Sequence, residues 1–130
     1  MRDYIALHAF ISQRSAMPFA WGYNRNDCVS FAAAAVLAAT GREIGFGGAR
    51  WHTASGAARV LKRLGGLQAA VDRELTRVAV PFAQRGDVVA VVGARGLLLA
   101  VVEGDTVAGP GPLGIMRLPR TASLIAWGAE

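Results

Sequence analysis

Cys28 is the single cysteine of this 130-residue chain, and its local sequence places it where a thiol can act as a nucleophile. It follows a loop rich in Pro, Gly and Asn and opens an alanine-rich helical pattern, in the run PFAWGYNRNDCVSFAAAAVLAATG. Asn26 or Asp27 can serve as the N-cap, which puts Cys28 in the first helical turn. The unpaired N–H groups and the helix dipole there favour a thiolate. Covalent catalysis by Cys28 also requires a base elsewhere in the chain.

The chain has two histidines, His8 and His52. His52 precedes Thr53 at a predicted helix start, in a loop that could approach the thiol, so it is the candidate base. The alternative for His52 is a packing role between Trp51 and the capping threonine, whereas the position of His8 favours a surface role. Neither histidine has a spaced carboxylate or thiol partner, so we expect no metal site and no cofactor.

The apolar spacing predicts helices in the first half of the chain and strands in the second. Four helices are expected, over 3–15, 28–40, 53–64 and 67–75. From residue 86 onward, short Val, Leu and Ile runs separated by Gly, Pro and Asp turns predict antiparallel strands, including 86–92 and 97–103. This order favours a single α+β domain over 1–130, with the central Cys28 helix packed on a C-terminal antiparallel sheet.

Composition and charge narrow the function classes. The apolar fraction is 53% and the charged fraction is 18%, which is typical of a compact chain rather than a disordered one. The net charge is +5, and the densest basic group is Arg59, Lys62 and Arg63 on a predicted helix. That group fits a solvated helix face or a partner-facing patch, and since no nucleic-acid-binding motif accompanies it, nucleic acid is a disfavoured partner.

The apolar segments do not predict a signal peptide or a membrane span. Polar residues interrupt the first 20 positions, which therefore lack the apolar core of a signal peptide. The longest apolar stretch, 31–39, is too short to cross a bilayer. We expect synthesis and folding in the bacterial cytoplasm and no membrane partner.

Three motifs occur in a fixed order along the chain: Trp21-Gly22, Asp27-Cys28 and Gly86-Asp87. Because these motifs occur in this order, the chain resembles the NlpC-type cell-wall cysteine peptidases of the papain-like superfamily over about residues 17–104. It is similar, more closely, to a small branch found beside phage and prophage tail genes, which shares Gly65-Gly66-Leu67 and a C-terminal tryptophan, here Trp127. The resemblance implies a papain-like fold with Cys28 at the nucleophile position and Asp27 before it.

The family's chemistry carries over only in part. The strand that begins with the catalytic histidine in the family has Leu98 at that position here, and Phe19 stands where the family has a tyrosine lining the site. Trp21 is expected to pack under the cysteine loop. Leucine cannot accept a proton, and general-base help is worth roughly 100- to 10,000-fold in rate. We therefore expect a poor nucleophile, with a thiol pKa near or above ~8.5.

A peptidase scaffold that lacks its catalytic base needs another role. We therefore expect a degenerate, non-catalytic assembly component of a phage or phage-like tail tip, which is incorporated into the particle. The expected partners are tail-hub or tail-tip proteins, with peptidoglycan as a second candidate. The candidate contact surfaces are 45–50 and 109–114, with Phe46 and Leu113 as apolar anchors. The alternative is an active cysteine hydrolase of peptidoglycan stem peptides, with a base from His52 or from a partner chain.

Overall fold

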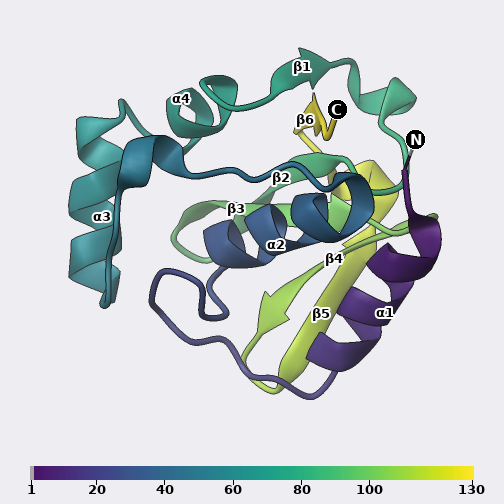
Figure 1. The fold of residues 1–130 in the computed structure, drawn as a ribbon, viewed down its shortest axis with the longest axis horizontal. Helices are drawn as coiled ribbons and strands as arrows, with labels where there is room; N and C mark the ends of the chain where they lie inside the picture. Colours follow the sequence, from purple (N-terminus) through teal and green to yellow (C-terminus); the bar gives the residue numbers. More distant parts are fainter. Residues whose placement is uncertain (1) are drawn as a thin grey trace.

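The computed structural model describes residues 2–130, so Met1 of the predicted domain lies outside the described residues. In this range four α-helices precede a six-stranded sheet (Figure 1). The helices are α1 (Tyr4–Arg14), α2 (Cys28–Thr40), α3 (Ala54–Arg63) and α4 (Leu67–Asp72). The strands are β1 (Thr76–Val78), β2 (Val88–Gly93), β3 (Gly96–Val102), β4 (Thr106–Gly111), β5 (Gly114–Pro119) and β6 (Ile125–Gly128). The predicted α+β class is confirmed.

Side-chain caps fix the starts of the three longer helices. Asp3, Asp27 and Thr53 each accept a hydrogen bond from a backbone N–H in the first turn of α1, α2 and α3. Helix α2 covers the predicted range and ends at Gly41, whose φ of 76° is the left-handed conformation that glycine adopts without a Cβ penalty. The caps therefore explain why the sequence predicted these helices well.

Helix α4 is shorter than predicted, because the chain turns after Asp72 toward a strand that the sequence did not predict. That strand, β1, has three residues and pairs antiparallel with β6, from Thr76↔Gly128 to Val78↔Ala126. So short a segment has no measurable alternation, and its pairing depends on a partner strand about fifty positions away.

The sheet is antiparallel throughout the described chain, with the strand order β1-β6-β2-β3-β4-β5. The predicted strands at 86–92 and 97–103 form the β2–β3 hairpin, in register from Val88↔Val101 to Gly93↔Gly96. Strands β3 and β4 lie beside α2, and the helix contacts both of them.

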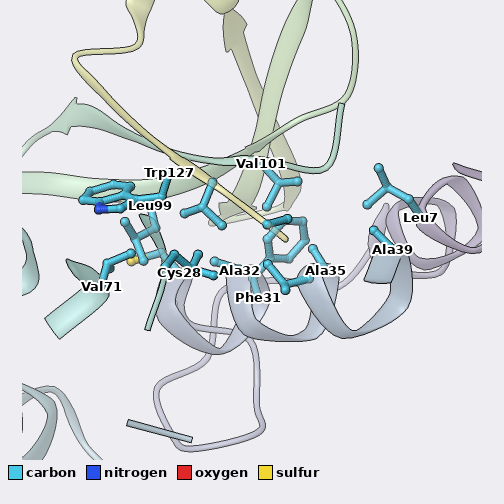
Figure 2. Close-up of a cluster of buried hydrophobic side chains, with 14 of the residues drawn as sticks. Leu7, Cys28, Phe31, Ala32, Ala35, Ala39, Val71, Leu99, Val101 and Trp127 are labelled. Atoms are coloured by element: carbon cyan, nitrogen blue, oxygen red, sulfur yellow. The ribbon is translucent and has the colours of Figure 1, made fainter. Parts of the chain in front are cut away.

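Helix α2 packs on the sheet through its small residues, as predicted. Ala32, Ala35 and Ala39 are at most 3% exposed, so the helix approaches the strands closely. Figure 2 shows this core, with Leu99 and Val101 of β3 and Trp127 of β6 facing the helix. A second apolar cluster on the sheet includes Val89, Val91, Ala100, Val102, Val107 and Ala126. The sheet is thus buried on both sides around the site.

Asp87, which is 2% exposed, joins the two ends of the chain. Its carboxylate accepts from Arg2 at 2.7 Å, from the Ala129 backbone N–H at 2.9 Å and from the Gln84 backbone N–H at 2.8 Å. Arg2 also contacts Glu130 at 2.7 Å. Asp87 is therefore a structural carboxylate.

Among the helices of residues 2–130, none combines the length and the apolar character that crossing a membrane requires.

Candidate functional site

Asp27 organises the polar side of the α2 N-terminus. It is the N-cap residue, and its carboxylate, 1% exposed, accepts the Ser30 backbone N–H at 2.8 Å. The same carboxylate accepts the Gly22 backbone N–H at 3.1 Å and the indole N–H of Trp51 at 2.7 Å. These donors come from the helix, the preceding loop and the segment before α3. One carboxylate thus fixes three parts of the chain around the cysteine.

Asn26 fixes the loop before the cysteine from its other end. Its side-chain amide donates to the carbonyl oxygens of Met17 and Pro18, at 3.1 and 2.9 Å. Arg14 donates to the Asn26 side-chain oxygen at 2.8 Å, and Asn26 also forms a β-bridge with Ala20. The loop that presents Cys28 is therefore rigidly attached to α1. Of the two N-cap candidates, Asp27 caps α2 and Asn26 holds the loop.

The sulfur of Cys28 lies on the apolar side of the same helix end. Cys28 is 9% exposed, and Figure 2 shows its sulfur beside Val71 and Leu99 in the main hydrophobic cluster. Two pockets adjoin it, of about 740 and 500 Å³. Phe19 and Leu98 line both of these pockets together with Cys28, so the structure brings these three predicted site residues together.

The surroundings of the thiol disfavour the thiolate. Burial raises the pKa of the Cys28 thiol to about 11, and the neighbouring charge of Asp27 acts in the same direction. Hydrogen bonds from the backbone of Leu99, Cys28 and Val29 lower it, and desolvation outweighs them. The pKa thus has the direction expected from the apolar substitutions at the site, and the helix N-terminus does not compensate for burial.

The two histidines lie outside this site. His52 is exposed and lines a third pocket, of about 820 Å³, with Arg50, Thr53 and residues of α3. His8 is exposed on α1. Neither contributes to the two pockets that adjoin Cys28. Within residues 2–130, no group of three or more His, Cys, Asp or Glu side chains is arranged to hold a metal ion.

Two sequence-based expectations about aromatic residues are wrong. Trp21 does not pack under the cysteine loop: it is 42% exposed and lies edge-to-face on Phe19, with ring centroids 4.9 Å apart, at the rim of the smaller pocket. The buried tryptophans are Trp51 and Trp127, at 6% and 0% exposed, and the indole N–H of Trp51 donates to Asp27. Phe46 is no exposed anchor either, since it is 9% exposed, whereas Leu113 is 94% exposed.

Comparison with known proteins places this fold in a family. Residues 2–129 match the family described as "Domain of unknown function (DUF6950)". The chain belongs to the DUF6950 family. No curated protein sequence matches it.

Among solved structures, the fold is similar to the crystal structure of the NlpC/p60 domain of the peptidoglycan hydrolase SagA. The TM-score is 0.62 at 19% sequence identity, covering 97% of this chain and 98% of that chain. The NlpC-type papain-like fold inferred from the motifs is therefore confirmed. At this identity the likeness establishes the fold, so the chemistry of this DUF6950 member has to be argued from its own site.

Proposed function

We propose that this protein is a non-catalytic NlpC/p60-fold domain that acts in the assembly of a phage or phage-like tail tip. The observation that carries the proposal is the apolar environment of Cys28, with Leu98 and Phe19 beside a thiol whose pKa is raised to about 11. A thiol without an imidazole partner forms little thiolate at neutral pH, and the thiolate is the nucleophile. The tail-tip assignment comes from the motif resemblance to the phage-associated branch.

The surface next to the site supports a docking role. The larger pocket at Cys28 continues along Gly109, Pro110, Gly111 and Pro112, the segment expected to make contacts. Val92 and Met116 also line this pocket and are 70% and 40% exposed. Exposed apolar side chains that share a pocket mark interaction sites more often than scattered ones do.

The β4–β5 hairpin next to this pocket is firmly attached to the rest of the domain. The Phe19 backbone N–H donates to the Gly111 carbonyl at 2.8 Å, and the Ile115 N–H donates to the Ser15 carbonyl at 3.1 Å. A Cβ at Gly114, where φ is 142°, would collide with the same Ser15 carbonyl. The hairpin thus presents Leu113 from a rigid turn, and a rigid apolar side chain loses little conformational entropy when it is buried by a partner.

The test is co-expression with the neighbouring tail proteins, followed by purification of the assembled particle. Leu113→Asp and Met116→Asp should prevent incorporation, because each places a charge in the proposed contact. Leu124→Asp is the matched control, since Leu124 is 56% exposed but lies outside the β4–β5 hairpin and lines neither pocket at Cys28, and it should assemble normally. Cys28→Ala should also assemble and leave the particle functional. Normal assembly of both Leu113→Asp and Met116→Asp, together with loss of particle function in Cys28→Ala, would contradict the proposal.

An active cysteine hydrolase of peptidoglycan stem peptides is the second candidate. The observation that favours it is the set of backbone hydrogen bonds at the thiol, from Leu99, Cys28 and Val29, which would stabilise a thiolate once a partner chain supplied a base. Under this hypothesis, muropeptides should be cleaved by the assembled particle and not by the isolated domain. Cleavage should disappear in Cys28→Ala, and His52→Ala would show whether the base belongs to this chain.

A further inference from the structure

The charge of this protein is concentrated in one segment, 44–71. This segment contains Arg50, Arg59, Lys62 and Arg63 and no Asp or Glu. It therefore carries four of the five net positive charges of the chain, and the remaining residues hold ten basic and nine acidic side chains. A concentration of this kind creates a local positive potential that the overall composition hides.

The structure gathers these cations around a concave surface. Arg59, Lys62 and Arg63 are spaced three and four residues apart on α3, so they share one face of the helix. Together with Arg50 they line the pocket of about 820 Å³ that also contains His52 and Thr53. An adjoining pocket, of about 520 Å³, is lined by Arg50, Arg63 and Arg73. We call these two pockets the basic groove. Helix α3 lies at the left edge of the molecule in Figure 1.

The cations of the groove lack carboxylate partners inside the described chain. The ion pairs among residues 2–130 join Arg2, Arg77 and Arg117 to acidic residues and include no side chain of the groove. Arg59, Lys62 and Arg63 are exposed, and two of the acidic residues that flank segment 44–71 are engaged elsewhere. Asp72 pairs with Arg77, and Glu74 accepts the Phe46 backbone N–H at 2.8 Å.

One cation of the groove is already oriented. The guanidinium of Arg50 lies 3.8 Å from the centroid of the Tyr23 ring, and Tyr23 in turn packs edge-to-face on Trp51 at 5.6 Å. Trp51 is itself fixed by Asp27. Because this stack holds Arg50 against a buried framework, less side-chain entropy remains to be lost when an anion binds.

We infer that the basic groove on α3 binds an acidic peptide segment of a partner protein. Guanidinium groups form forked, bidentate hydrogen bonds with carboxylates, and three of the four cations of segment 44–71 are arginines. The floor of the groove includes Val60 and the largely buried Trp51, which suits the side chains of a peptide. This inference extends the proposed assembly role to a second surface, and it does not depend on whether Cys28 is catalytic.

The groove is less suited to nucleic acid. Single-stranded nucleic acid binds by stacking bases on exposed aromatic rings, and the tryptophan and phenylalanine that line the groove, Trp51 and Phe46, are 6% and 9% exposed. Duplex DNA needs a basic surface that follows two phosphate backbones over many contacts, whereas the cations here surround two short pockets. An acidic peptide of a few residues matches this size better.

The experiment measures binding of a fluorescein-labelled ten-residue glutamate-rich peptide to the full chain by anisotropy at low salt. The triple variant Arg59→Gln, Lys62→Gln, Arg63→Gln should bind about tenfold or more weakly. The matched control is Arg25→Gln, Arg85→Gln, Arg117→Gln, which removes three charges that line neither pocket of the groove and should change the affinity by less than about threefold.

Two outcomes would overturn the inference. If the control triple variant weakens binding as much as the groove variant does, the peptide responds to net charge alone. If a ten-nucleotide deoxythymidine oligomer binds more tightly than the peptide at the same salt, and the groove variant abolishes that binding, the groove is a nucleic-acid site. Thermal unfolding of both triple variants checks that they fold. Their midpoints should lie close to that of the wild type, because the substituted side chains are exposed and contribute little to stability.

Discussion

The two sides of the α2 N-terminus differ sharply, although they are one residue apart in sequence. On one side Asp27 accepts hydrogen bonds from Gly22, Ser30 and Trp51. On the other side the sulfur of Cys28 lies beside apolar side chains, Val71 and Leu99. The polar side is a complete hydrogen-bond network, whereas on the sulfur side no histidine of residues 2–130 lines the pockets at Cys28.

This difference separates what the fold needs from what catalysis needs. The Asp27 network holds the loop, the helix start and the segment before α3 in place, so its loss would cost stability whatever the protein does. The surroundings of Cys28 meet a packing requirement, because an apolar pocket stabilises a neutral thiol. The scaffold and the chemistry at its nucleophile position can therefore change independently, so each side can be tested by itself.

The largest expected effect is the loss of Asp27. Asp27→Ala should lower the free energy of unfolding by about 3 kcal/mol or more, since it removes a helix cap and leaves buried donors of Gly22 and Trp51 unpaired. Asp3→Ala is the control, because Asp3 caps the exposed start of α1 and should cost about 1 kcal/mol. Urea denaturation at neutral pH measures both values. Equal costs would show that the network around Asp27 adds nothing beyond an ordinary cap.

The buried thiol should make the protein sensitive to alkaline pH. The folded-state pKa of Cys28, about 11, lies above that of a free thiol, so the neutral thiol stabilises the folded state. Its contribution to the free energy of unfolding is complete below the free-thiol pKa and is lost as pH rises toward 11. By pH 10 the wild type should lose roughly 1.5 kcal/mol that Cys28→Ala does not lose. Urea denaturation of both proteins at pH 7 and pH 10 isolates this difference, and parallel pH dependences would contradict it.

An imidazole beside the sulfur should restore part of the missing chemistry. Leu98 lines both pockets at Cys28, so Leu98→His should accelerate alkylation of Cys28 at pH 7.5 by about tenfold or more, by forming an ion pair with the thiolate. Leu118→His puts the same side chain on β5, in the larger pocket alone, and should change the rate much less. Equal acceleration by both variants would show that general loosening of the site, and not a placed base, exposes the thiol.

A smaller effect is expected from the single hydrogen bond between Trp51 and Asp27. Trp51→Phe keeps most of the buried ring and removes the indole N–H, so it should destabilise the protein by about 1–2 kcal/mol. Trp21→Phe alters a tryptophan that is 42% exposed and should stay within about 0.5 kcal/mol of the wild type. Thermal unfolding compares the two, and the reverse order of costs would mean that Trp51 does not support the network.

The local sequence predicted the elements around the site well, because their signals are local. Asp27 and Gly41 mark the two ends of α2, and short apolar runs separated by turn residues mark the β2–β3 hairpin. The resemblance placed Leu98 next to Cys28, and the two residues do line the same pockets.

The remaining features depend on partners that are distant in sequence. The bond between Trp51 and Asp27 joins residues 24 positions apart, so no local pattern indicates that Trp51 pairs with this carboxylate while Trp21 stays exposed. Phe46 lies in a glycine-rich segment typical of an exposed loop, yet its backbone is held by Glu74 and its ring is buried. β1 exists because β6 offers it an edge. These contacts follow from tertiary packing and not from periodicity.

The most direct test of the central claim is the rate of alkylation of Cys28 by iodoacetamide as a function of pH, in the folded wild-type protein. Cys28 is the single cysteine, so the rate reports one thiol. With a pKa of about 11, the rate should be low at neutral pH and should still be rising at pH 9, without a plateau. A plateau reached below pH 7 would reveal an activated thiolate, and it would contradict the account of Cys28 as a buried thiol without a catalytic base.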